Sequence, residues 1–451
     1  MNKEERMLNG NLWKNILLFS VPLMLSNLLQ VLFNITDIAV VGKFSSDIAL
    51  GAVGSTTMLV SLYTGLLLGL GNGVNVFVAR FLGAKENDKV RAIVHTGFWV
   101  SFFYGLIIFA FSLGLSYPIL TLIKTKEELI HDAFLYLAIY SFGFPAMSFY
   151  NYGNGVYSAA GNTRRPLIFL TISGIINLGL NLLFVIGFNM GVEGVAISSV
   201  IAQYISAILI FISLKKDNSE IKLIFKGIKS DKESVKNILS IGIPSGVQYA
   251  IFAISNMFIQ SGINYFDHVT VEGISASTNI DSFIYEPIYA FYTAAASFIS
   301  KNYGAGQKDR ILKSYLISFT YAFSIALILG TILFFYGRFF LGLFTNSSEV
   351  IDAGMERLKV MGLVYCISAF MDTTTAACRG LGKTLVPTIM VITGTCIFRI
   401  VWIYTVFAHY HTIESLFIVY VITWVITSIP EIFYFGIIYR RSTKNLVPIN
   451  A

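Results

Sequence analysis

The feature that most constrains this chain is a series of long apolar runs, each close to the length of helix that crosses a bilayer. A helix rises 1.5 Å per residue, so roughly 20 residues span the ~30 Å of hydrocarbon. Twelve such runs lie between charged residues or Gly and Pro breaks, at approximately 16–41, 52–78, 93–115, 133–158, 167–187, 194–214, 238–265, 274–298, 314–336, 358–377, 385–408 and 416–438. Hydrophobic residues fill 55% of the 451 positions and charged residues only 13%, which is too apolar for a water-soluble fold. The sequence therefore predicts an all-α integral membrane protein with twelve transmembrane helices.

The distribution of Lys and Arg predicts the orientation of these helices. With the amino terminus inside, 25 of the 32 basic residues fall in the termini and in the loops on the inner side. Because positive residues are retained in the cytoplasm, we expect both termini there and the protein in the plasma (inner) membrane. The basic residues expected outside are Lys43, Lys124, Lys126, Arg338, Arg357 and Lys359, and Arg399 is the one expected within a span. This asymmetry explains the net charge of +7, so no nucleic-acid partner is expected.

The chain repeats itself once, with a shift of 221 or 222 residues. The motif KNILLFSVP ending at Pro22 returns as KNILSIGIP ending at Pro244, and GNTRRP ending at Pro166 returns as GKTLVP ending at Pro387. Six helices is an even number, so both repeats enter the membrane in the same direction, as two pseudo-symmetric six-helix bundles. The expected parts are an amino-terminal lobe at 1–214, a cytoplasmic linker at 215–236 and a carboxy-terminal lobe at 237–451. Two lobes facing a central cleft predict a transporter that works by alternating access.

The first span carries a polar stripe. Asn27, Gln30, Asn34 and Asp37 are spaced by 3, 4 and 3 residues, so they share one face of the helix. A polar seam between packed helices accounts for Asn27 and Gln30 equally well. For Asp37 we favour a function, because a carboxylate inside the membrane needs a proton or a cation beside it.

Two further spans of the first lobe place polar side chains at the depth of Asp37. Asn177 and Asn181 lie one turn apart in the span at 167–187, and Ser199 lies near the outer end of the next span. Oxygen-rich groups around one carboxylate can hold Na⁺, or can tune the carboxyl to bind and release H⁺. We therefore predict a cation-coupling site formed by these residues with Asn34, and the residues alone leave both ions open.

Polar and aromatic side chains on both sides of the predicted cleft are candidates for contacts with an organic cation, since rings supply cation–π contacts and carboxylates supply charge. These substrate candidates are Gln30, Gln248, Asn256, Asp281, Tyr285, Glu286 and Tyr289. Helix packing and the aromatic belt at the membrane surface are the alternative explanation for the tyrosines. Arg399 lies at a comparable depth, and we hypothesise that it forms an ion pair with Asp281 or Glu286.

The chain lacks the patterns of an enzyme or of a metal protein. No HExxH motif and no serine elbow is present, so a membrane-embedded enzyme is disfavoured. The three cysteines, at 366, 378 and 396, have no metal-ligand spacing. No cofactor is expected beyond H⁺ or Na⁺ as the coupling ion.

Several segments together resemble the multidrug and toxic compound extrusion (MATE) family over nearly the whole chain. They are NITDIAVVGKF, ARFLGAKE with its repeat SKNYGAGQ, SAAGNTRRP with its repeat RGLGKTLVP, and NLGLNLLFVIGFNMGVEGVAISS. The resemblance implies a proton- or sodium-driven antiporter that exports organic cations and other toxic compounds through a two-lobed cleft. Family members with a first-lobe coupling site use a helix 1 aspartate, similar in context to Asp37, with polar partners that match Asn177, Asn181 and Ser199.

Two departures from the family pattern shape the expectation. Asn181 stands where those relatives have a second aspartate, so one negative charge remains to offset the dehydration of Na⁺. The NorM branch also has an acidic residue on helix 7, near Phe252 here, so its second-lobe site is not expected to be intact. We therefore favour proton coupling through Asp37. A lipid or polysaccharide flippase is the rival within transport, and we expect a monomer that exports small cationic molecules.

Overall fold

The structure is a computed structural model that describes residues 3–123, 125–225 and 231–449. Helices account for 87% of it, and this described part contains no strand, which confirms the all-α membrane fold. The predicted outer residue Lys124 and positions 226–230 of the predicted linker lie outside the described residues. Nine elements of the described chain lie before residue 226: α1 (Lys3–Asn9), α2 (Leu12–Phe44), α3 (Asp47–Gly83), α4 (Asn87–Leu122), α5 (Glu127–Ser141), α6 (Phe144–Ala159), α7 (Arg164–Leu182), the π-helix η1 (Leu183–Gly187) and α8 (Val192–Lys215). The helix α9 (Lys232–Ile263) follows the gap.

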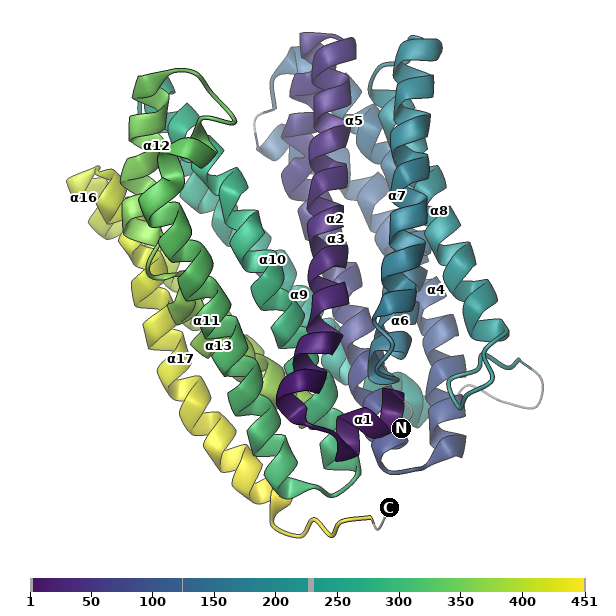
Figure 1. Ribbon diagram of the computed structural model, residues 1–451. Helices are drawn as coiled ribbons and strands as arrows, with labels where there is room; N and C mark the ends of the chain where they lie inside the picture. The colour runs from purple at the N-terminus through teal and green to yellow at the C-terminus, as the bar shows by residue number, and fades with distance from the viewer. Residues whose placement is uncertain (1–2, 124, 226–230, 450–451) are drawn as a thin grey trace. The chain divides into compact units, whose positions relative to one another are not determined.

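The remaining helices complete the second repeat (Figure 1). They are α10 (His268–Gly304), α11 (Lys308–Leu341), α12 (Ser348–Met361), α13 (Tyr365–Gly380), α14 (Leu385–Val391), η2 (Ile392–Ile397), α15 (Phe398–Trp402), η3 (Ile403–Phe407), α16 (Ala408–Tyr410) and α17 (Ile413–Thr443). The segments α14 to α16 follow one another as a single helical span, Leu385–Tyr410. This span contains two π-helical segments, η2 and η3, and π turns inside α-helices are frequently found at functional sites.

Each of the twelve predicted runs falls on a helix or on a bent helix pair. Within the described residues, however, fewer than twelve of these helices are both long and apolar enough to cross a membrane. Nine helices of the described chain are long and apolar enough to cross a membrane, and two bent pairs raise the number to 11. The bent pairs are α5 with α6, at 48°, and α12 with α13, at 52°. The run predicted at 274–298 is the remaining one, and it is helical as part of α10.

Two compact units divide the chain by internal contacts. Unit 1 contains Glu5–Met24 and Ile251–Ala451, and unit 2 contains Leu25–Ala250. The division falls inside α2 and inside α9, so the first half of each helix packs in one unit and the second half in the other. Ile16, for example, is buried in the apolar core of unit 1, and Ile238 in that of unit 2. The lobe boundaries at 214 and 237 stay a prediction.

Side chains at the helix starts satisfy backbone N–H groups that have no partner within the helix. Ser46 accepts from the N–H of Ala49 at the start of α3, and Asp267 accepts from that of Thr270 at the start of α10. Thr412 forms a reciprocal capping box at the start of α17. Such caps fix where the helices begin, and so fix the depth of the polar side chains along each span.

Both ends of the chain contact the turn between α10 and α11 within unit 1. Arg310 donates to the carbonyl oxygen of Met7 at 3.1 Å, and the backbone N–H of Ile449 donates to that of Ala305 at 3.1 Å. Met7 and Ile449, near the two ends of the described chain, therefore lie on the same side of unit 1, as an even number of spans requires. Their placement in the cytoplasm stays a prediction.

Candidate cation-coupling site

Asp37 lies in the second half of α2 and is only 8% exposed. Its carboxylate accepts two hydrogen bonds from other helices of unit 2. The amide nitrogen of Asn181 on α7 donates to one oxygen at 2.5 Å, and the hydroxyl of Ser199 on α8 donates to the other at 3.0 Å. Three helices thus meet at one buried carboxylate, and α7 lies beside α8 (Figure 1).

Asn177 closes a ring of hydrogen bonds around Asp37. Its amide nitrogen donates to the Ser199 hydroxyl oxygen at 3.3 Å, and its amide oxygen accepts from Asn181 at 3.4 Å. Every donor in the ring therefore points, directly or through one neighbour, toward the carboxylate. This polarity is that of an ionised Asp37, because a protonated carboxyl would need an acceptor for its own O–H. The structure brings together four of the five side chains predicted to form this site.

The local sequence explains how the ring is built. Asn177 and Asn181 are one helical turn apart and share a face of α7. The π-helix η1 begins two residues after Asn181, and a π turn of this kind re-aims the chain near a site. The Asn181 amide oxygen is buried without a hydrogen-bond partner in the described structure. An acceptor is thus available beside Asp37 for a proton that arrives there.

No Lys, Arg or His of the described ranges lies within ion-pair distance of Asp37. Two tyrosines on α5, Tyr136 and Tyr140, are buried and interact electrostatically with Asp37. Tyr140 also hydrogen-bonds to Gln203 on α8. Sequence reasoning missed these rings, although their spacing of four residues on the apolar run at 133–158 was a signal for a shared helix face. Both rings are therefore part of the buried surroundings of the carboxylate.

Asn34 and Gln30 do not join this ring. Asn34 lies one turn before Asp37 on α2, but its side chain is exposed and makes no hydrogen bond to the ring within the described chain. Gln30 is also exposed, and its amide nitrogen lies 3.5 Å from the backbone oxygen of Ser26 on its own helix. Neither residue contributes to holding the carboxylate.

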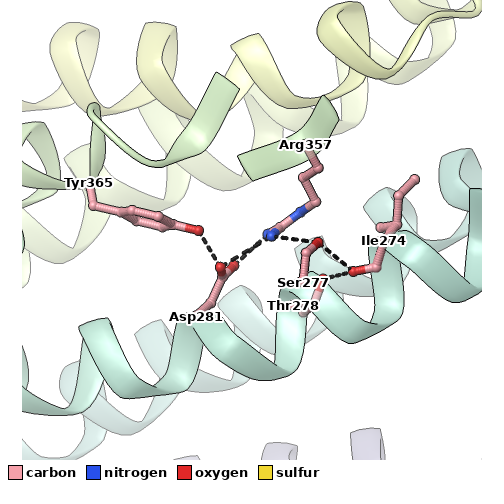
Figure 2. Close-up of polar contacts among 6 residues, drawn as sticks. All are labelled: Ile274, Ser277, Thr278, Asp281, Arg357 and Tyr365. Atoms are coloured by element: carbon pink, nitrogen blue, oxygen red, sulfur yellow. Dashed lines mark hydrogen bonds and ion pairs between the residues drawn. The ribbon is translucent and has the colours of Figure 1, made fainter. Parts of the chain in front are cut away.

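Asp281 is held in a buried ion pair with Arg357, which corrects the predicted pairing with Arg399. Figure 2 shows its carboxylate bound by both terminal guanidinium nitrogens of Arg357 and by the hydroxyl of Tyr365. Arg357 also donates to Ser277 at 3.2 Å and lies over the ring of Phe417 at 4.7 Å. The hypothesis that Arg399 neutralises Asp281 is therefore wrong.

Arg357 itself was expected in an outer loop, and that expectation is also wrong. It lies in the last part of α12 and is 2% exposed. The carboxylate of Asp281 is consequently neutralised within its own unit, and its predicted role in binding a substrate stays a prediction. The alternative pairing of Arg399 with Glu286 stays a prediction.

The other substrate candidates occupy varied environments. In unit 1, Asn256 is exposed on α9, Tyr285 packs edge-to-face on Tyr365 at 5.6 Å, and Tyr289 stacks on Tyr292 at 5.4 Å. The Glu286 side chain is partly buried. Gln248 is buried on α9 in unit 2. The aromatic pairs agree with the packing explanation for the tyrosines, and the substrate role of this set stays a prediction.

The comparison with a family model identifies the class of protein. MatE matches residues 22–183 and 244–405, one segment in each repeat. The chain belongs to this family of multidrug efflux transporters, whose members are transporters and not enzymes.

Curated relatives cover most of the chain. "Probable multidrug resistance protein YpnP" of Bacillus subtilis is 31% identical over 362 residues, covering 79% of this chain and 80% of the relative. "Probable multidrug resistance protein NorM" of Thermotoga maritima is 24% identical over 391 residues, covering 84% and 82%. "Multidrug export protein MepA" of Staphylococcus aureus is 22% identical over 382 residues, covering 84% of each chain.

Solved structures share the fold over almost the full length. One, described as the "outward-facing conformation of a multidrug resistance MATE family transporter of the MOP superfamily", has a TM-score of 0.90 at 22% identity and covers 98% of each chain. A MOP superfamily transporter from Pyrococcus furiosus, for which a reversed polarity of the binding pocket is described, has the same TM-score, identity and coverage. These likenesses confirm the architecture of the MATE fold.

Proposed function

We propose that this protein is an antiporter that exports small organic cations in exchange for a coupling cation bound at Asp37. The observation that carries the proposal is a buried carboxylate with hydrogen-bond donors from two other helices and no basic partner among the described residues. An ionisable group in the membrane without a counter-ion is costly unless a small cation neutralises it during the cycle. The multidrug exporters among the relatives support the substrate class, and family membership favours export over the flippase alternative.

The coupling ion that fits the ring best is H⁺. The groups nearest the carboxylate are N–H and O–H donors, and they satisfy both of its oxygens in the ionised form without a metal ion. When Asp37 is protonated, its O–H needs an acceptor, and a half-turn of the Asn181 amide presents the oxygen that has no partner in the ionised arrangement.

This reversal links ion binding to the packing of three helices. The half-turn removes the donor that Asn181 gives to Asn177, so the ring must rearrange between α2, α7 and α8. A ligand shifts a conformational equilibrium only through different affinities for the two states. We therefore expect the proton to bind more tightly in one state of this bundle, with outward release of the drug following protonation from outside.

The test is drug transport by the full chain in proteoliposomes, with tetraphenylphosphonium as the probe. Imposed pH and Na⁺ gradients are compared for wild type, Asp37→Asn and the control Asp132→Asn, which removes an outer carboxylate of α5 from a contact with His131. We expect a pH gradient to drive accumulation in wild type and in the control, while Asp37→Asn shows only downhill movement. Gradient-driven accumulation by Asp37→Asn at the wild-type level would overturn the proposal, and a response only to Na⁺ would replace the proton by sodium.

We further propose that the protein works in the plasma membrane as a monomer with both termini in the cytoplasm. The support is that the carboxylate and all its ring partners belong to one unit of one chain. Protease digestion of terminal tags in sealed inverted vesicles is expected to remove both tags. Protection of either tag would contradict the orientation.

A further inference from the structure

The internal repeat relates the coupling site to a counterpart in unit 1. The two matched family segments, 22–183 and 244–405, are displaced by 222 residues. Asp37 lies 15 positions after Pro22, and the residue 15 positions after Pro244 is Ile259. The same displacement relates Asn181 to Ile403. Both isoleucines are buried members of one apolar cluster, so apolar side chains stand where the first repeat has its carboxylate and its main donor.

Side-chain contacts show that this sequence correspondence is also a structural one. In unit 2 the ring of Phe33 packs where a side chain on Gly174 would lie. The corresponding residues, 222 positions on, are Ser255 and Cys396, whose side chains also interact. The helix contact beside the coupling site is thus present in both repeats, with the same pair of positions.

Arg399 occupies the position that corresponds to Asn177. In unit 2, Asn177 contacts Ser199, the eighth residue of α8. In unit 1, the guanidinium carbon of Arg399 lies 3.9 Å from the ring centroid of Tyr420, the eighth residue of α17. The contact between amide and hydroxyl is therefore replaced by one between a cation and an aromatic face, which attracts positive charge.

The surroundings of Arg399 hold its charge inside the bundle. It is 2% exposed and interacts electrostatically with Asp372, a partly buried carboxylate on α13. The other titratable groups that face it are Tyr285 on α10, Tyr420 on α17 and Cys396 on η2. Asp281, the other acidic residue considered as a partner of Arg399, is bound by Arg357 and Tyr365.

We propose that unit 1 contains a disabled copy of the coupling site, in which the tethered guanidinium of Arg399 replaces an exchangeable cation. The copy has Ile259 in place of the carboxylate and carries the permanent positive charge of Arg399 within the bundle. It therefore neither binds nor releases an ion during transport. The inference rests on the proposed coupling through Asp37 and extends it. One coupling ion, bound in the first repeat, is exchanged per cycle.

The experiment measures the ratio of coupling ions to substrate in proteoliposomes of the full chain. The membrane potential is clamped with K⁺ and valinomycin, and the pH or Na⁺ gradient that balances a known tetraphenylphosphonium gradient gives the ratio. Wild type and Arg399→Lys, which keeps the charge, are both expected to give one ion per substrate. Asp37→Asn is expected to give zero. The double variant Ile259→Asp with Arg399→Asn restores the carboxylate and the amide that correspond to Asp37 and Asn177, and it is expected to raise the ratio to two.

The outcomes separate the inference from the function on which it rests. Coupled transport by Asp37→Asn at a ratio of one refutes the function of Asp37. A wild-type ratio of two refutes the inference, as does the loss of only one of two ions in Asp37→Asn. Both measurements keep Arg399 in place, so they test the second site as it exists. The double variant is judged to be folded when its elution profile is monodisperse. If it then still gives a ratio of one, Arg399 does not prevent ion binding in unit 1, and this part of the inference is refuted.

Discussion

Removing the positive partner of the buried ion pair in unit 1 is expected to destabilise the protein more than removing both partners. Side-chain exposures of 3% for Arg357 and 9% for Asp281 place the pair out of water. Arg357→Met leaves a buried carboxylate with only the Tyr365 hydroxyl as a donor, and breaking such a pair costs about 3–5 kcal/mol. Replacing both residues by apolar side chains is commonly neutral or stabilising.

The expected values follow from a double-mutant cycle. Arg357→Met and Asp281→Leu are each expected to cost about 3–5 kcal/mol, and the double variant about 0–2 kcal/mol, since the Tyr365 hydroxyl then lacks its acceptor. The coupling energy between the two sites is therefore at least about 4 kcal/mol. Tyr365→Phe removes one hydrogen bond to a charged group and is expected to cost about 1.5–3 kcal/mol.

Three cysteines make the measurement direct. Cys366, Cys378 and Cys396 are free and buried within unit 1, so a maleimide dye that fluoresces on thiol reaction reports the unfolding of that unit. Denaturant titrations in detergent give the midpoint for each variant. If the double variant loses as much stability as the two single variants combined, the two charges act independently and the reasoning fails.

Three further predictions concern unit 2. Gly69→Ala should impair folding, because its new methyl group would meet the backbone of α9, whereas Gly54→Ala, with nothing within 4 Å, should be neutral in the same elution assay. Asn181→Asp adds a second carboxylate to the ring and should make transport depend on a Na⁺ gradient; unchanged ion preference would contradict the role of that position. Burial raises the pKa of Asp217, but hydrogen bonds from Ser219 outweigh burial and lower this pKa below its ordinary value of 3.8. The carboxylate therefore stabilises the fold above pH 3.8, and this contribution is lost in stronger acid. Asp217→Asn should therefore destabilise at pH 7 and converge with wild type at acid pH, and an equal loss at both would exclude the linkage.

The helices were predictable because apolar length is a strong signal, whereas their irregularities were not. All twelve runs fall on helices, but α10 is not among the helices that are apolar enough to cross a membrane. Its sequence contains charged residues such as Asp281 and Glu286, which lower its mean hydropathy. The bends after Ser141 and after Met361 lie at corresponding places of the two repeats. The Gly and Pro residues near the first bend were a local signal for it.

The ring around Asp37 was predictable for a geometric reason, and the pairing of Asp281 was not. Spacing within a helix and depth along each span locate a side chain in two dimensions, which sufficed to bring together Asp37, Asn181 and Ser199. Arg357 lies one residue before the apolar run at 358–377 and so resembled a residue at the membrane surface. Only the packing of α12 against α10 shows that it turns inward.

The exchange of half-helices has a consequence for the origin of the chain. Residues Glu5–Met24 belong to a different compact unit from the rest of their own repeat, and the same holds for the start of α9. A half-length precursor with a single repeat would have left an unfilled groove where this segment packs, and two copies trading amino-terminal segments would have filled it for each other. Gene fusion would then have made this reciprocal exchange of segments permanent. If the chain is cut at the linker, the two fragments should therefore be soluble in detergent only when they are produced together.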